Sequence, residues 1–550
     1  MRDGRNRANV DRQRAAEAQE LPPEAVYWSR RQALRPVRLF ASILVGLAFV
    51  FFMGWTIEAL DEPTKFDFEI AAATHPARPE PWMPSEGIDP EVLESIDFEQ
   101  VHGRLLPDWV ISLQHDPYTL GQSREQRRFE ALMQEAGKDP NLESLLRKLR
   151  DGATSGVTAH AREISQLIDG WNEYMQQAQL PWYVAYDLLK TARGGRLYTR
   201  SYRVHADLAP TVSGQPQHVR LLVRVDTTNV GELFFGQTNV DERRAMVVTD
   251  RIAEFALDRV WPMMDPSSDH RLNAMDRAFA PSLRREAATV LGPDELASLE
   301  LGAATRRGLQ DRLQEIAARK GCGRGIEVDN LPWNGLTPRG RSIVARAVAH
   351  NVQTKCKRLT EEDGRQLIGD SDALSQNEEL HRALGQLTAW LARAVSVHEV
   401  RHLADGPAAP TLACDGCPAE VSKHGGAEVS AYVASMATEG VGYLALYQAC
   451  GVDLPVAHDS GGAVDFVLSV LAPRGCASGP PARLYEQARV LDWILFKRAE
   501  RIVLPANFPD VLPLPSVRSA PPDPGFEVLA GGPLRTRHPA HAGFPMRALL

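Results

Sequence analysis

The sequence predicts a mostly helical α+β protein with a small antiparallel sheet, preceded by one transmembrane helix. Three observations lead to this prediction: an uncharged apolar run near the N-terminus, a short region in which apolar and polar residues alternate, and long stretches of helical periodicity after it. With 550 residues, the chain is long enough to bury a sizeable core in two or three folded units.

The apolar run covers residues 39–57 and reads "LFASILVGLAFVFFMGWTI", which is long enough to cross a bilayer as a helix. Four arginines lie in the ten residues before the run, and three acidic residues follow it closely. Arginine on one side only indicates that residues 1–38 are cytoplasmic and that the rest is exported. We therefore expect a single-pass membrane protein with a periplasmic or extracellular domain. A cleaved signal peptide and a buried core helix are the alternatives, and the length of the run favours an uncleaved anchor.

Composition and periodicity divide the chain further. The predicted segments are a basic cytoplasmic segment 1–38, the transmembrane helix 39–57, a proline-rich stalk 58–95, a mixed α/β region 96–265, a helical region 266–502 and a tail 503–550 rich in proline and glycine. In the mixed region, "GRLYTRSYRVHADL", "QHVRLLVRVDTT" and "VGELFFGQT" alternate apolar and polar residues, which predicts the antiparallel sheet. The tail is expected to be flexible or to lie as a strap over the domain.

Charge and cysteine usage limit the function. A formal net charge of -8 argues against a nucleic-acid binder, which needs a basic surface to neutralise phosphates. The six cysteines all lie beyond the apolar run and suggest disulfides formed in an oxidising compartment, namely Cys322, Cys356, Cys414, Cys417, Cys450 and Cys476. Cys414 and Cys417 have CxxC spacing. Because no second CxxC completes a four-cysteine zinc site, a short-loop disulfide is favoured over a zinc knuckle or a thiol redox pair.

The stretch "AVSVHEVRHLADG" contains two histidines four residues apart, His398 and His402, with Glu399 directly after the first. The apolar stripe of the preceding helix continues onto both histidines, so both are expected to point inward. Two imidazoles one helical turn apart can bind a single metal ion. Glu399 lies beside them, where it can take a proton from metal-bound water. The alternative is a pair of solvent-facing or hydrogen-bonded core histidines.

A catalytic zinc site needs three protein ligands and an open position for water. Asp405 and Ala408 stand where the extended metzincin motif requires glycine and histidine, which excludes that class. Beyond His402, "GGAEVSAYVASMATEG" predicts a new helix with Glu428 in its first turn. Glu428 is a candidate third ligand, and its competitors are His424, Glu420 and Glu439.

These motifs resemble the gluzincin clan of zinc metallopeptidases, in which an HExxH helix and a glutamate on a following helix complete the site. The resemblance covers about residues 378–450 and points to the clan, because the gap before Glu428 and the cysteine pair inside it match no single family. It implies a zincin-like metallopeptidase domain in which His398, His402 and Glu428 bind Zn²⁺ and Glu399 is the general base. It also implies a protein or peptide substrate.

Three more residues are candidates for supporting roles. The oxyanion of the reaction needs a hydrogen-bond donor. Tyr432, on the helical face of Glu428, and His458, in "AHDSGG", are candidates, although a core tyrosine and a loop histidine are the simpler interpretations. Asp405 is placed one turn from His402 and is a candidate to orient that imidazole.

The leading prediction is a membrane-anchored zinc peptidase that acts on the exported side. Two alternatives remain: a non-catalytic scaffold with a peptidase-like fold, and a structural zinc site whose fourth ligand is His424 or a cysteine. Glu399 argues against the scaffold, because a glutamate beside the ligands has no structural duty there. By analogy with related peptidases, the substrate is expected to add as a strand to a sheet edge near the metal helix.

Overall fold

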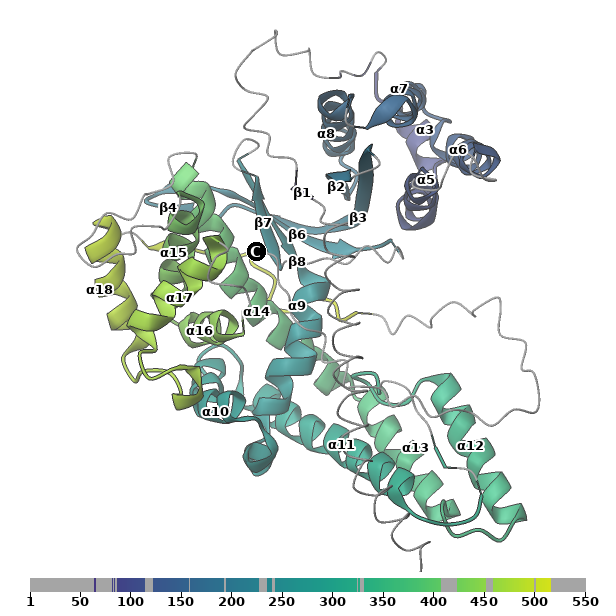
Figure 1. Cartoon of the computed structure of the whole chain (residues 1–550), viewed down its shortest axis with the longest axis vertical. Helices are drawn as coiled ribbons and strands as arrows, with labels where there is room; N and C mark the ends of the chain where they lie inside the picture. The colour runs from purple at the N-terminus through teal and green to yellow at the C-terminus, as the bar shows by residue number, and fades with distance from the viewer. Residues whose placement is uncertain are drawn as a thin grey trace, which may run out of the picture.

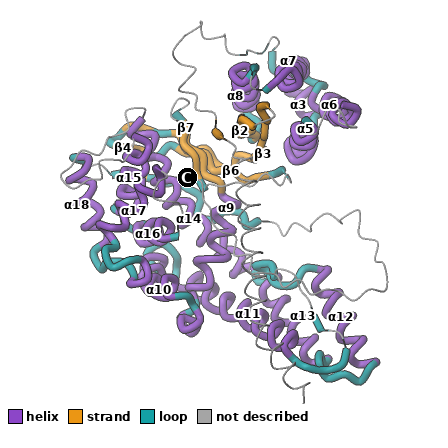
Figure 2. The backbone as a smooth tube through the Cα atoms, in the orientation of Figure 1, coloured by secondary structure: helices purple, strands orange, loops and turns teal. Residues whose placement is uncertain are grey.

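The protein is described by a computed structural model over residues 64–65, 82, 84, 87–113, 122–157, 159–191, 194–226, 235–239, 243–323, 325–326, 331–406, 423–451, 459–498 and 501–515. Most of these residues are helical. A sheet lies between a small N-terminal group of helices and a larger helical body (Figure 1, Figure 2).

The N-terminal helices have a hydrophobic core of their own. They are α3 (Pro90–Glu94), α4 (Phe98–Gln100), a π-helical turn (Val101–Leu105), α5 (Leu106–Ser112), α6 (Gln122–Ala136), α7 (Pro140–Gly156) and α8 (Ala161–Gln177). Asp139 caps α7, since its carboxylate accepts the backbone N–H of Leu142 at 2.8 Å. The same carboxylate accepts the hydroxyl of Tyr174 on α8 at 2.7 Å, which ties the two helices together.

A histidine without a hydrogen-bond partner lies in this core. His102 is fully buried in the π-helical turn, and its ring stacks on Trp182 with centroids 4.8 Å apart. Among the described residues, neither of its ring nitrogens has a hydrogen-bond partner. Burial lowers the pKa of His102 to about 3, because a charged imidazolium is poorly solvated there. The histidine thus costs stability without forming a polar contact.

Replacing His102 with phenylalanine is expected to raise the free energy of unfolding by about 1–3 kcal/mol, since the ring keeps its stacking and the buried polar atoms disappear. The replacement also changes the pH dependence. As pH falls, His102 takes up a proton near pH 6.5 in the unfolded chain and only near pH 3 in the folded chain. Between these two pH values the free energy of unfolding of the native protein therefore falls by about 1.4 kcal/mol per pH unit.

Urea unfolding at pH 7 and pH 5 measures both effects. His218→Phe is the matched control, because His218 is exposed. A His102→Phe variant that is less stable than the native chain, or that keeps the native loss of stability between pH 7 and pH 5, would contradict this account of the buried ring.

The main sheet has six strands in the order β1–β2–β3–β6–β8–β7. Their bounds are β1 (Thr64–Lys65), β2 (Trp182–Thr191), β3 (Gly194–Leu208), β6 (His218–Arg224), β7 (Gly236–Asn239) and β8 (Arg244–Val248). The predicted antiparallel sheet is corrected here, because β6 and β8 pair in parallel. The reason is the position of β7: the chain passes from β6 to the sheet edge, forms β7, and returns as β8 between the two.

The prediction of a leading transmembrane helix is also corrected. The predicted span, residues 39–57, lies outside the described residues. Within the described part of the chain, no helix combines the length and the apolar character needed to span a membrane. The two longest helices, α11 with 26 residues and α14 with 28, carry charged side chains along their length. The fold class becomes a mostly helical protein with a curled mixed sheet, and the single-pass, exported localisation is withdrawn.

The helical body follows the sheet and contains the largest core. Its helices are α9 (Thr249–Phe255), α10 (Ala274–Ala287), α11 (Pro293–Ala318), α12 (Pro338–Gln353), α13 (Glu361–Ser375), α14 (Glu378–Asp405), α15 (Lys423–Met436), α16 (Gly442–Cys450), α17 (Asp459–Leu471) and α18 (Leu484–Phe496). Helix α14 contacts α11, α15, β7 and β8, and most of its side chains are buried. It is the central helix of the body.

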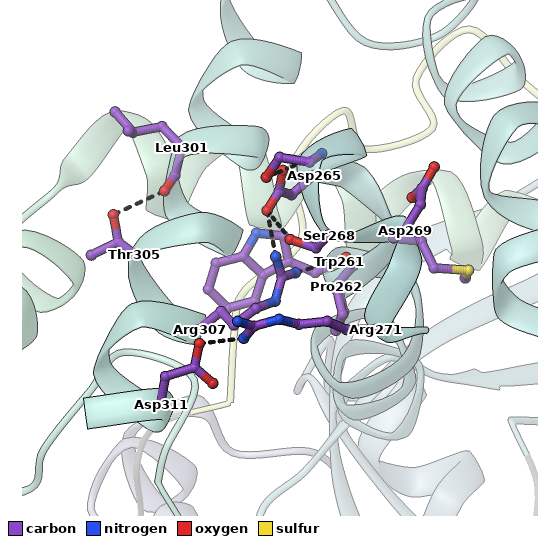
Figure 3. A network of polar contacts seen from close by, with 12 residues as sticks. Trp261, Pro262, Asp265, Ser268, Asp269, Arg271, Leu301, Thr305, Arg307 and Asp311 are labelled. Carbon is purple, nitrogen blue, oxygen red and sulfur yellow. Dashed lines mark hydrogen bonds and ion pairs between the residues drawn. The ribbon is translucent and has the colours of Figure 1, made fainter. Parts of the chain in front are cut away.

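A polar network fastens the turn after α9 to α11 (Figure 3). Asp265 accepts hydrogen bonds from the hydroxyls of Ser267 and Ser268 and forms an ion pair with Arg307 of α11. Trp261 donates its indole N–H to the carbonyl of Leu299 at 2.9 Å. Both contacts hold α11 against the segment that leaves the sheet, and α11 in turn packs on α14.

Residues 502–515, the end of the described chain, lie over α14. β9 (Ile502–Val503) pairs with β4 (Thr211–Val212), which also pairs with β5 (Gln215–Pro216). Further on, Leu512 donates its backbone N–H to the carbonyl of Gly385 on α14 at 3.0 Å. A Cβ atom at Gly385 would stand 2.6 Å from Val511, so only glycine allows this approach. The rest of the predicted tail, residues 516–550, lies outside the described residues.

Candidate metal centre

Helix α14 presents His398 and His402 on one face, one turn apart. Their Nε2 atoms are 3.2 Å apart, and the ring planes are inclined at 76°. Two nitrogens that bind one tetrahedral zinc ion at ordinary bond lengths are about 3.3 Å apart. The two imidazoles are therefore already arranged to share an ion.

Helix α15 brings Glu428 to the same point. Its carboxylate oxygens lie 3.4 Å from Nε2 of His398 and 3.6 Å from Nε2 of His402. One ligand atom from each of the three residues fits within 4.8 Å of the others. The carboxylate is 5% exposed, so it is a buried acid facing two imidazoles. This donor set, two neutral nitrogens and one carboxylate oxygen, suits zinc and related divalent ions.

The charge of Glu428 acts on His398. Burial lowers the pKa of His398, but the hydrogen bond and the negative charge of Glu428 outweigh it and raise the pKa above its ordinary value. A cation at this point would replace the proton that the imidazole otherwise attracts, because ligands bind metal in their deprotonated form. The electrostatics of the cluster therefore favour positive charge between the three side chains.

Glu399 lies beside the cluster, against the edge strand β7. Thr238 on β7 donates its hydroxyl to Oε2 of Glu399 at 2.7 Å. A Cβ atom at Gly236 would stand 2.6 Å from Oε1 of Glu399, so the strand approaches the carboxylate by its bare backbone. Burial raises the pKa of Glu399 to about 7, against the lowering effects of His398 and the Thr238 hydroxyl. A carboxylate with this pKa can exchange protons near neutral pH.

Tyr432 lies one turn beyond Glu428 on α15, and its ring contacts the edge of the His398 ring with centroids 4.7 Å apart. It is buried, and burial together with the charges of Glu428 and Glu399 raises its pKa well above the ordinary value. The phenol therefore keeps its proton over the physiological range and remains a hydrogen-bond donor beside the cluster.

Of the other predicted candidates, Glu439 lies away from the cluster. His458, Glu420 and the Cys414–Cys417 pair lie outside the described residues. His424 lies in the first turn of α15. Glu439 forms an ion pair with Arg489 at 2.7 Å on the surface. Among the described residues, Glu428 is the carboxylate that groups with the two histidines.

Asp405 has other partners than the one expected from the sequence. Its carboxylate pairs with Arg498 at 3.1 Å and with Arg401 at 3.6 Å, and it accepts the hydroxyl of Ser430 on α15. Arg498 also donates to the Ser430 hydroxyl at 2.6 Å. The group ties the end of α14 to α15 and to the segment after α18, so it fixes the two ligand helices relative to each other.

Sequence reasoning missed Thr238, Gly236 and Arg498. Thr238 stands 161 positions before Glu399, in a strand identified only by alternation. No spacing rule connects a strand residue with a helix residue at that separation. The carboxylate partner of Arg401 could have been predicted. Arg401 occupies one of the variable positions inside the HExxH motif, and a buried arginine needs a carboxylate partner.

No protein-family model, no curated protein and no solved structure matches this chain. The interpretation of the site accordingly rests on its residues and their geometry.

Proposed function

We propose that this protein is a zinc-dependent peptidase that hydrolyses peptide bonds of a protein or peptide substrate, with Glu399 as its general base. The observation that carries the proposal is the convergence of His398, His402 and Glu428 within 4.8 Å, together with a buried carboxylate beside them. In a structural zinc site four protein ligands fill the coordination shell, and no general base is needed beside it. A catalytic site has three protein ligands, an open position for water and a general base.

The roles of the residues follow from their positions. When bound, zinc would polarise the scissile carbonyl and acidify a water molecule. Glu399 accepts the proton of the attacking water and passes it to the leaving amine. Without a metal ion, burial places the pKa of Glu399 at about 7; a nearby cation lowers that pKa and favours the carboxylate form that a base needs. Tyr432, which stays protonated, supplies a donor for the oxyanion.

The edge strand β7 supports an extended peptide as the substrate. β7 is the last strand in the sheet order and hydrogen-bonds to β8 on one side. A peptide that adds to the other side of β7 as a further strand runs past Glu399, because Thr238 and Gly236 of β7 both contact that carboxylate. Backbone pairing of this kind recognises extended chains with little dependence on sequence.

Hydrolysis of an unfolded protein by the full-length chain tests the proposal. We expect cleavage of reduced, denatured protein in the presence of one equivalent of zinc, loss of cleavage after dialysis against a strong chelator, and recovery when zinc is returned. Cleavage that survives complete removal of metal would exclude the proposed mechanism. Zinc-loaded protein that cleaves neither unfolded protein nor mixed peptide libraries would leave a binding role for the site.

Thr238→Val is expected to lower kcat by about 10- to 100-fold, since a hydrogen bond to a charged group contributes about 1.5–3 kcal/mol. The hydroxyl stabilises the carboxylate form, so its loss raises the pKa of Glu399. The acid limb of the pH–rate profile therefore moves to higher pH. Thr238→Ser keeps the donor and restores the native profile. A drop in activity without a shift of the acid limb would show that Thr238 acts only through folding.

A further inference from the structure

Two chain segments meet at the far end of the helices α11, α12 and α13, away from α15–α18 (Figure 1). One segment follows α11 and the other follows α12. Arg319 donates to Asp363 at 2.7 Å and to the carbonyl of Arg358 at 3.4 Å. In the opposite direction, Arg358 donates to the carbonyl of Ala317 at 3.2 Å. The two segments are thus fastened to each other from both sides.

Glycines bring the first segment close to Cys356 on the second. A Cβ atom at Gly323 would stand 2.5 Å from the side-chain oxygen of Asn351 and 3.1 Å from Cβ of Cys356, and Gly323 has a positive φ of 85°. A Cβ atom at Gly321 would stand 3.9 Å from Sγ of Cys356. Gly321 and Gly323, on either side of Cys322, therefore both lie next to Cys356. At position 323 only glycine fits, because a Cβ atom there would clash and the backbone has a positive φ.

Cys322 and Cys356 are both free thiols. Cys322 is exposed and Cys356 is buried. The neighbouring Cys356 side chain raises the pKa of the Cys322 thiol. Elsewhere in the fold, Cys450 and Cys476 already form a disulfide, which links α16 to the segment after α17. Among the described residues, the chain therefore carries one disulfide, Cys450–Cys476, and one pair of reduced cysteines, Cys322 and Cys356.

We infer that Cys322 and Cys356 are a redox modification site, at which an external disulfide converts the two thiols into an intramolecular disulfide. The exposed Cys322 thiolate attacks one sulfur of the external disulfide and releases one thiolate. Cys356 then attacks the Cys322 sulfur of the mixed disulfide and releases the second. Two electrons pass to the external disulfide, and the two protons of the cysteines end on the released thiols. The inference is independent of the peptidase proposal.

The new bond closes the chain between the ends of α11 and α12. It adds to the polar contacts of Arg319 and Arg358 and restricts the unfolded state of this part of the protein. Because α11 packs on α14, oxidation makes the support of the central helix harder to unfold. Reduction removes the covalent bond and leaves the arginine contacts in place.

The full-length protein equilibrated with mixtures of oxidised and reduced glutathione tests the inference. After alkylation and proteolysis, mass spectrometry should find a peptide cross-linked through Cys322 and Cys356 that increases with the share of oxidised glutathione. The thermal unfolding midpoint should rise by a few degrees in parallel. Cys450–Cys476 is the internal standard, since it is already oxidised.

Two variants separate the outcomes. In Cys356→Ser, Cys322 should accumulate as a mixed disulfide with glutathione, because the second step has no thiol. In Cys322→Ser, the buried Cys356 should stay unmodified. The inference is overturned if native Cys322 accumulates as the mixed glutathione disulfide, or if both cysteines remain alkylated in the most oxidising mixture.

Discussion

Replacing Glu399 with glutamine is expected to lower kcat/KM for peptide hydrolysis by about 10²- to 10⁴-fold while zinc stays bound. Glutamine has nearly the same shape and retains an acceptor for the Thr238 hydroxyl, but it cannot take the proton of the attacking water. The ligands His398, His402 and Glu428 are untouched. The loss should therefore appear in kcat, and the zinc content should remain near that of the native protein.

Initial rates on an unfolded protein and zinc content, measured on the same preparations, test this expectation. Glu379→Gln is the matched control, because Glu379 lies exposed in the first turn of the same helix. It should leave both quantities unchanged. A Glu399→Gln variant that cleaves at the native rate would remove Glu399 from the mechanism, even if the metal site is present.

Removing a metal ligand is expected to have the other large effect. Alanine in place of His398 or Glu428 should weaken zinc binding by more than about 100-fold, since even partners outside the coordination shell contribute 10- to 100-fold. Activity should fall with the metal. Glu428 is buried, the side chain of His398 is only 12% exposed, and the two face each other, so solvent is a poor replacement for either ligand.

Competition with a chromogenic chelator measures the affinity of each variant. Glu439→Ala is the matched control for Glu428→Ala, because both glutamates belong to or follow α15 and Glu439 pairs with Arg489 on the surface. The control should bind zinc like the native chain. If Glu439→Ala loses zinc while Glu428→Ala retains it, the third ligand has been assigned wrongly.

The part of the site that lies within helices was predictable from the sequence. The apolar stripe of α14 leads directly onto His398 and His402, and the period of a helix fixes their common face. Glu428 and Tyr432 share a face of α15 for the same reason. What the sequence does not contain is the approach of the two helices, and that is determined by packing and by the ion pairs of Asp405.

The contacts of Glu399 could not be predicted from the sequence, for a related reason. Thr238 and Gly236 reach it only because β7 is the edge strand beside α14, and the order of strands in a sheet depends on pairings between distant segments. The same limit explains the parallel pairing of β6 and β8, which alternation within each strand cannot reveal. The length of the apolar run and the arginines before it led to the membrane-spanning prediction for residues 39–57, and the described helices do not support it.

Zinc X-ray absorption spectroscopy of the full-length protein, loaded with one equivalent of zinc, tests the central claim most directly. The account predicts a first shell of nitrogen and oxygen only, at about 2.0–2.2 Å, with the outer-shell scattering of two imidazoles. This result would place the metal on His398, His402 and Glu428. Sulfur scattering at about 2.3 Å would place it on cysteines instead and would contradict the account.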